Sequence, residues 1–456
     1  MVNDYSRAFV RRLWPSEAAE RPSPAALVLA LAVPFIFLHS HYQPSVSAGP
    51  VTADLTDFAI LAAVVAAFVS GLRDGFGPLR GARAVWAPLI GFCVVLLASV
   101  GWAHHADPAY GVKDHLVSAS KFVEYVFLAG AVPLALRREA DRRVFLWAVV
   151  LWSTFLSLIA VLQFLGIVPE FKGLRPEQRE PSYIGIHDLG AFSGAALSIG
   201  FASILLALRR RQGAWAAATG AVGIGVAAAL DAVGGMLVTA VAAIALARRR
   251  GPLALRRVLT VVLLCALVTV AAVTLRGSAI RSFLRFLGVE PPTKAELHQI
   301  QTYSQRTLLA YIGLQIWIHH PVVGVGWQES ELPHSFRPYL VRAHRRFPNA
   351  APQAFPSAAH TWGVQNGIVQ TLSDLGIVGG ILLAWTLIST IRLIVRVAAR
   401  GPPELLWGSL VAVGWVLFAL AVFTGSGLLP GIPVDALLWL SVGLAVSLHN
   451  SLAAGR

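Results

Sequence analysis

The chain has 456 residues, of which 37 are basic and 23 acidic, so that 13% of its residues are charged, against roughly 25% in an ordinary soluble protein. Apolar residues make up 56% of the chain, and this composition nearly excludes a soluble fold. A net charge of +14 would favour a nucleic-acid partner for a soluble domain, but here most basic residues lie between apolar segments. We therefore expect an all-α polytopic membrane protein that contacts membrane lipids and binds no nucleic acid.

Twelve apolar stretches have about the 17–25 residues that a helix needs to cross the roughly 30 Å hydrocarbon layer of a bilayer. They lie near 25–41, 55–72, 85–103, 114–136, 143–167, 187–208, 213–230, 232–248, 254–275, 375–397, 405–424 and 432–448. We predict about 12 transmembrane helices from them. Residues 1–24 contain Glu17, Glu20 and prolines, so we expect a cytoplasmic N-terminal segment there rather than a signal peptide.

The positions of Lys and Arg predict the orientation, because cytoplasmic loops retain these residues. With the N-terminus inside, 23 of the 37 basic residues fall in cytoplasmic segments, and the five short outside loops share four. We expect a multi-pass protein of the cytoplasmic (inner) membrane with both termini in the cytoplasm. The chain then divides into transmembrane helices 1–9 (25–275), an extracytoplasmic loop (276–374), and helices 10–12 with the cytoplasmic C-terminus (375–456).

The long extracytoplasmic loop exceeds the roughly 12–15 residues of an ordinary connection and contains helical patterns instead of a linker composition. Gln305 to His320 has the apolar spacing of a helix and is followed by Pro321, which ends a helix. We expect this loop to be folded and largely helical, with that helix lying on the membrane surface or capping the bundle.

Motifs for nucleotide binding are absent, and the predicted inside loops are at most about a dozen residues long. The two cysteines, Cys93 and Cys265, lie in apolar runs and indicate neither a disulfide nor a zinc site. The long loop has no pair of carboxylates at metal-ligand spacing. We therefore expect no cofactor and no metal, and either a reaction at the outer face on an activated substrate or transport.

The most distinctive part of the sequence is RTLLAYIGLQIWIHHPVVGVGW (306–327), followed by HTWGVQNGIVQTLSDLGIVGG (360–380). This pairing resembles the O-antigen ligase family, also called the Wzy C-terminal domain superfamily. Its members have an Arg-led outside helix, a proline turn with two glycines, and a histidine segment that leads into a helix with the pattern L-x-x-x-G-x-x-G. The matching residues here are Arg306, His320, Pro321, Gly324, Gly326, His360, Leu375, Gly376 and Gly379.

The resemblance implies a membrane glycosyltransferase of lipopolysaccharide or cell-surface polysaccharide biosynthesis. Such an enzyme moves a glycan from polyprenyl (undecaprenyl) diphosphate to an acceptor hydroxyl outside the cytoplasmic membrane, with inversion and without metal. By position, its catalytic histidine and arginine would be His360 and Arg306.

The side-chain chemistry of these residues agrees with that implication. Arginine forks match phosphate oxygens in pairs and keep their charge near lipid, so Arg306 suits a diphosphate, and Arg179 and Arg175 in another outside loop are further candidates for binding it. His360 can accept a proton from a hydroxyl or stay protonated beside phosphate. The sequence leaves these two roles open.

Three departures from the family pattern affect donor binding. Many members have Ser-Arg-Gly-Gly entering the eighth helix, where this chain has Asp231-Ala232-Val233-Gly234-Gly235 and lacks the arginine. Thr361 replaces the Asn that follows the motif histidine, and the acidic residue appears as Asp374. Donor binding would then depend more on Arg179 or Arg175.

Two further patterns have structural interpretations. Gly376 and Gly380 have the spacing of a close helix-packing site. Lys121 and Glu124 would face the same way on the fourth helix and could form an ion pair that points into the bundle.

The alternatives of the same fold are a polysaccharide polymerase and a protein O-oligosaccharyltransferase, so the acceptor can be a glycan, a lipid or a protein. An alternative of another class is a secondary transporter or lipid flippase, which twelve helices alone would suggest. Transporters of this size usually contain internal repeats, and we find none here.

Overall fold

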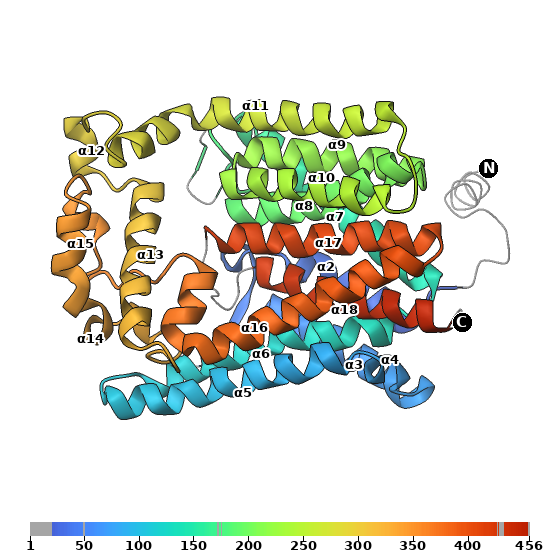
Figure 1. The fold of residues 1–456 in the computed structure, drawn as a ribbon, viewed down its shortest axis with the longest axis horizontal. Coiled ribbons are helices and arrows are strands. Elements are labelled where there is room, and N and C mark those ends of the chain that lie inside the picture. The colour runs from blue at the N-terminus through green and yellow to red at the C-terminus, as the bar shows by residue number, and fades with distance from the viewer. Residues whose placement is uncertain are drawn as a thin grey trace.

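The computed structural model describes residues 21–48, 51–170, 173–174, 176–425, 427 and 433–454. Within these residues, ten helices are long and apolar enough to cross a membrane, and they lie roughly side by side (Figure 1). The chain is thus an all-α, multi-pass membrane protein. The ten helices are α3 (Leu55–Asp74), α5 (Arg83–Ala106), α6 (Val112–Ala135), α7 (Glu139–Phe164), α8 (Ile186–Leu206), α10 (Leu230–Arg248), α11 (Leu255–Phe286), α16 (Gly367–Arg400), α17 (Pro403–Phe423) and α18 (Pro433–Ala454).

Two of the twelve predicted segments form helices that are not among these ten. Helix α2 (Pro24–Ile36) has 13 residues, and at about 1.5 Å per residue it is shorter than the hydrocarbon layer. Helix α9 (Arg210–Ala227) begins with two arginines and a glutamine and is rich in Ala and Gly. It packs closely on α8, because a Cβ on Gly200 of α8 would lie 2.7 Å from Ala217.

The short elements near the N-terminus bring an ion pair between two spanning helices. Strands β1 (Ser45–Ala48) and β2 (Val51–Asp54) form an antiparallel hairpin that leads into α3. Lys121 of α6 donates to Asp57 of α3 at 3.0 Å and lies 3.9 Å from Asp54. Its partner is therefore a neighbouring helix and not Glu124, and the pair joins α3 to α6. The remaining short turns near this end are the 3₁₀ turn Ser40–Tyr42 and α4 (Gly77–Arg80).

Residues 287–366, which we name the capping segment, lie together at one end of the helices (Figure 1, left). They contain α12 (Lys294–His298), α13 (Thr302–His319), α14 (Pro333–Phe336), α15 (Leu340–Arg346) and 3₁₀ turns at Glu329–Glu331, Arg337–Tyr339 and Pro352–Ala354. The segment has its own hydrophobic core of Leu308, Leu309, Ile312, Ile316, Phe336, Tyr339, Ala343 and Phe355. The segment is folded, and the predicted helix ending before Pro321 is present and packs on the segment's own core; residues 276–286 and 367–374 of the predicted loop belong to α11 and α16.

A break in α16 connects the capping segment to the membrane helices. Gly376 has φ 63° and ψ −162°, a conformation that only glycine adopts easily, so α16 is two helices in succession. The turn after α13 pairs with this break: the Val325 and Gly326 amides donate to the Ser373 and Asp374 carbonyls at 2.9 and 2.8 Å. A Cβ on Gly376 would lie 2.3 Å from the Val322 carbonyl oxygen. The sequence interpretation of Gly376 as a helix-packing glycine was wrong, because its neighbour is this turn.

The opposite end of the helices contains the arginine-rich connections, which contact one another. Arg137 donates to the Asp74 and Gly75 carbonyls at 3.0 and 2.7 Å, and Arg250 donates to the Ala399 and Gly401 carbonyls at 2.7 and 2.6 Å. Figure 1 places α4 and the α16–α17 connection at the end opposite α12–α15. One end of the helices thus contains the folded capping segment, and the other end contains arginine-rich connections that contact one another.

This arrangement predicts labelling from opposite sides of the membrane. In a variant without Cys93 and Cys265, a cysteine placed at Ala350 and one placed at Arg249 should react with a membrane-impermeant maleimide from different faces of sealed vesicles. Ala350 lies in the capping segment, and Arg249 lies in the connection between α10 and α11 at the opposite end of the helices. Labelling of both cysteines from one face would contradict the arrangement.

Candidate active site

Arg306 lies in the second turn of α13 and reaches the membrane helices. Its Nε donates to Oε1 of Gln365 at 3.1 Å, and one terminal nitrogen lies 3.0 Å from Nε2 of His187. Gln365 belongs to the stretch that follows His360, and His187 is the second residue of α8. Arg306 therefore joins the capping segment to the bundle.

His187 also contacts Asp231. The chemistry of Arg306 and Asp231 determines which ring nitrogen of His187 carries the hydrogen. An arginine only donates hydrogen bonds, so Nε2 of His187 accepts from Arg306. Nδ1 then carries the hydrogen and donates to the Asp231 carboxylate at 2.7 Å. Asp231 also accepts from the Ala232 amide at 2.8 Å, which holds the carboxylate at the start of α10. The neutral imidazole thus fixes the orientation of Arg306.

Two more arginines lie close to this group. The pKa of Arg179 is lowered to about 10, first by burial and then by the positive charges of Arg276 and Arg306. Burial also lowers the pKa of Arg306. Arg276, from the C-terminal half of α11, lies over the ring of Tyr303 at 5.0 Å, and its buried Nε has no acceptor among the described residues. We name Arg179, Arg276 and Arg306 the arginine cluster.

The arginine cluster has more positive charge than its surroundings neutralise. Among the described residues, Asp231 is the one carboxylate whose charge raises the pKa of Arg179 and Arg306. Three guanidinium groups close enough to shift one another's pKa favour binding of an anion. A diphosphate, with several oxygens and two negative charges or more, fits such a site.

The predicted site residues divide between this cluster and the surface. The structure brings Arg306 and Arg179 together. His360 lies exposed in the capping segment, with its ring against Trp362 at 5.9 Å between centroids and its amide on Ser357 Oγ at 3.2 Å. Gln365, five residues further on, is the residue of that stretch that reaches Arg306. Arg175 lies outside the described residues.

Sequence reasoning missed His187, Arg276 and Gln365, and it treated Asp231 only as a departure from a family pattern. A signal for two of them was present, since His187 and Asp231 each stand within the first turn of an apolar helix at the same predicted end. An ionisable residue within an apolar membrane segment is a functional-site hypothesis, and both residues border such segments. Their pairing could not be seen, because they are 44 residues apart.

An apolar groove of about 450 Å³ runs along α16, and Phe423 of α17 lines part of it. Its lining includes Gly367, Ile368, Leu372, Ile377, Ile381, Leu387, Leu420 and Phe423. Ile368, Ile377 and Ile381 are also exposed on the outer surface of the bundle, so the groove opens toward the membrane. A Cβ on Gly425, two residues after Phe423, would lie 3.0 Å from a terminal nitrogen of Arg306. One end of the apolar groove therefore lies near Arg306 of the arginine cluster.

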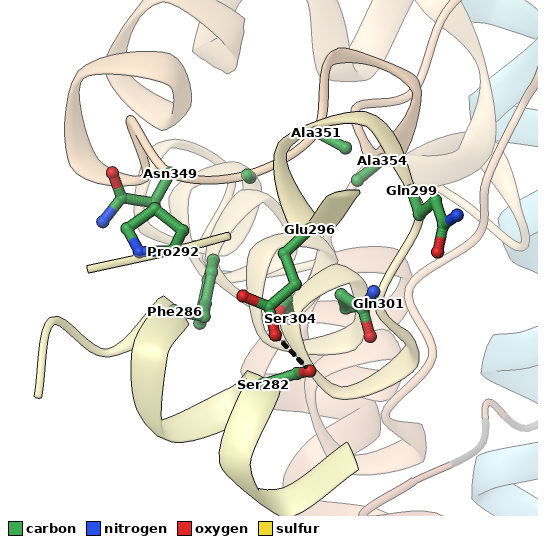
Figure 2. Close-up of a pocket in the computed structure, with 11 residues that line it drawn as sticks. Ser282, Phe286, Pro292, Glu296, Gln299, Gln301, Ser304, Asn349, Ala351 and Ala354 are labelled. Atoms are coloured by element: carbon green, nitrogen blue, oxygen red, sulfur yellow. Dashed lines mark hydrogen bonds between the residues drawn. The ribbon is translucent and has the colours of Figure 1, made fainter. Parts of the chain in front are cut away.

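A second pocket lies near the start of α13 and is lined by both polar and apolar side chains (Figure 2). Glu296, Gln299, Gln301, Ser304 and Asn349 line it, and Ser282 donates to Glu296 at 2.5 Å. Its volume of about 10 Å³ holds at most one water molecule. It is therefore too small for a sugar, and its hydrogen bond fastens α12 to the end of α11.

Comparisons with known proteins leave the site to be interpreted from its own geometry. No family model matches the chain, and no curated protein sequence matches it either.

The arginine cluster predicts binding of inorganic pyrophosphate by the purified protein. Replacing Arg179, Arg276 or Arg306 with Gln should each weaken binding by roughly tenfold, because a hydrogen bond to a charged group is worth about 1.5–3 kcal/mol. Isothermal titration calorimetry at two salt concentrations measures the affinity and its ionic component. Arg281→Gln, an exposed arginine on the same helix as Arg276, is the matched control and should leave the affinity unchanged. Equal affinity in all four variants would contradict the assignment.

Proposed function

We propose that this protein is an O-antigen ligase-like membrane glycosyltransferase that transfers a glycan from polyprenyl diphosphate to an acceptor hydroxyl. The observation that supports it most is the meeting of an anion-binding arginine cluster with the end of an apolar groove that opens toward lipid. A lipid diphosphate has both parts, an apolar chain and a charged head, joined in that order. The resemblance of residues 306–327 and 360–380 to the O-antigen ligase family supports the same donor.

In the proposed reaction the acceptor oxygen attacks the anomeric carbon of the glycan from the face opposite the diphosphate. The new C–O bond forms as the bond to the diphosphate oxygen breaks, so the configuration inverts and the electron pair leaves on the diphosphate. Arg179, Arg276 and Arg306 stabilise this developing charge, as a divalent metal does in other glycosyltransferases. No metal is therefore needed at the reacting atoms.

The acceptor proton needs a base, and two histidines are candidates. Nε2 of His187 already accepts from Arg306, so His187 acts as a positioning residue for the guanidinium. His360 is exposed, and its ring contacts Trp362 and not the arginine cluster. We propose that His360 accepts the proton of the acceptor hydroxyl, because an acceptor can approach the capping segment from water.

We further propose that the capping segment lies outside the cytoplasmic membrane, with all twelve apolar segments in the bilayer and both chain ends in the cytoplasm. The arginine-rich connections at the opposite end support this orientation, because positive loops stay in the cytoplasm. The acceptor can be a glycan, a lipid or a protein hydroxyl, since ligase, polymerase and protein glycosylation use the same donor chemistry.

Substitutions of Arg306 and His360 test the reaction. Arg306→Lys keeps the charge but loses the paired geometry, so transfer should fall by a factor on the order of ten to a thousand. His360→Ala should abolish transfer while the protein remains folded and membrane-inserted. The measurement is glycan transfer from a radiolabelled polyprenyl diphosphate donor by purified protein, with Arg281→Lys and His298→Ala as controls. Transfer at the native rate by His360→Ala would remove His360 from the mechanism, and movement of the donor across vesicles without transfer would favour a flippase.

Filling the groove should weaken binding of a long lipid chain. Ala384 lines the groove and is exposed, so Ala384→Trp can occupy the groove without overpacking a core. KM for the polyprenyl donor should rise by roughly tenfold, which corresponds to losing the burial of about two CH₂ groups. The KM for a donor analogue with a short lipid chain should not change. Ala271→Trp, at an exposed position of α11 outside the groove, is the control, and an unchanged KM in Ala384→Trp would contradict this placement of the lipid.

A further inference from the structure

Three potential metal ligands meet where the capping segment touches α5. Asp107 follows the last residue of α5, Glu329 lies in the 3₁₀ turn after Trp327, and His334 lies in α14. One ligand atom from each lies within 4.8 Å of the others, and Nδ1 of His334 is 3.4 Å from Oε1 of Glu329. Glu329 and His334 are five residues apart, whereas Asp107 is distant in the sequence and comes from a different connection.

Glu329 is the unusual member of this group. Only 1% of the residue is exposed, and its Oε2 accepts a hydrogen bond from none of the described residues. Its other oxygen accepts from Ser335 Oγ at 3.0 Å. Burial raises the pKa of Glu329, and the nearby Asp107 carboxylate raises it further. A buried carboxylate oxygen without a donor, beside a second carboxylate, is costly unless a cation or a proton neutralises it.

We propose that Asp107, Glu329 and His334 bind one divalent transition-metal ion, which fastens the capping segment to the end of α5. Two carboxylates with one imidazole suit Mn²⁺ or Zn²⁺, whereas Mg²⁺ and Ca²⁺ prefer oxygen ligands alone. The side chain of His334 is 58% exposed, so the ion can arrive from water and keep water in its remaining coordination positions. Nδ1 of His334 and Oε1 of Glu329, 3.4 Å apart, already have about the separation of two ligands bound to one ion at roughly 2.0–2.2 Å.

The contacts around this group explain what the ion would stabilise. Tyr110 Oη donates to the Trp327 carbonyl at 2.6 Å, and the Trp327 amide donates to Ser99 Oγ at 3.0 Å. A Cβ on Gly326 would lie 2.4 Å from Ala103 of α5. The three ligands thus surround the place where the chain leaves the membrane helices, and none of them contacts Arg306, His187 or Asp231 in the described hydrogen bonds. The ion would stabilise the attachment of the capping segment to α5. This role is independent of the proposed transfer reaction.

Metal binding and thermal unfolding of the purified, untagged protein test the proposal without any activity measurement. After treatment with EDTA and desalting, the protein should bind one equivalent of Mn²⁺, measured by the electron paramagnetic resonance signal of the free ion, and one equivalent of Zn²⁺, measured by calorimetry. At an ion concentration about 100-fold above Kd, the melting temperature should rise by on the order of 2–4 °C or more. Mg²⁺ at the same concentration should produce a smaller rise.

Three variants decide whether these residues are the ligands. His334→Ala and Asp107→Asn change exposed or half-buried groups and should fold, and each should weaken metal binding by about tenfold or more and remove the rise in melting temperature. Glu290→Gln, an exposed carboxylate elsewhere in the capping segment, should bind as the unmodified protein does. The proposal is overturned if the protein binds no stoichiometric metal, if both ligand variants bind as tightly as the unmodified protein, or if Glu290→Gln loses binding equally. The first result would mean that a proton neutralises Glu329.

Discussion

The placement of Arg306 against the membrane helices depends on the backbone pairing between the turn after α13 and the break in α16. The Val325, Gly326, Ile377 and Val378 amides donate across this contact at 2.8–3.2 Å, so two irregular stretches satisfy each other's polar groups. Left-handed glycines on both sides, Gly324 and Gly376, allow the chains to approach this closely. The contact fixes α13 relative to the bundle and thereby places Arg306 beside His187.

The arginine cluster shows how a membrane protein can gather like charges without unfolding around them. Each arginine comes from a separate element: Arg179 from the connection before α8, Arg276 from α11 and Arg306 from α13. Desolvation and mutual repulsion oppose the charged state of Arg179, and Asp231 offsets only part of this cost. A bound anion, such as the diphosphate of the proposed donor, would supply the remaining neutralisation.

Asp231 connects the start of α10 to the arginine cluster through His187. Its carboxylate holds Nδ1–H of His187, which leaves Nε2 free to accept from Arg306. Arg276 lies over the ring of Tyr303 at 5.0 Å, and its positive charge lowers the pKa of Arg179. The start of α10 thus contributes the carboxylate that orients His187, while the cations of the cluster come from other elements.

The sequence by itself determined the membrane class, the positions of the helices and the folded capping segment, because apolar length, proline stops and arginine placement are local properties of the chain. It also indicated Arg306 and Arg179 from their chemistry and position. Only the tertiary structure decided which residues meet: His187 with Asp231, Gln365 with Arg306, Lys121 with Asp57, and Asp107 with Glu329. Three of these contacts join residues 44 to 64 positions apart, and Asp107 and Glu329 are farther apart still. Such pairs form when helices pack, and no periodicity in the sequence encodes the rotation and depth at which two helices meet.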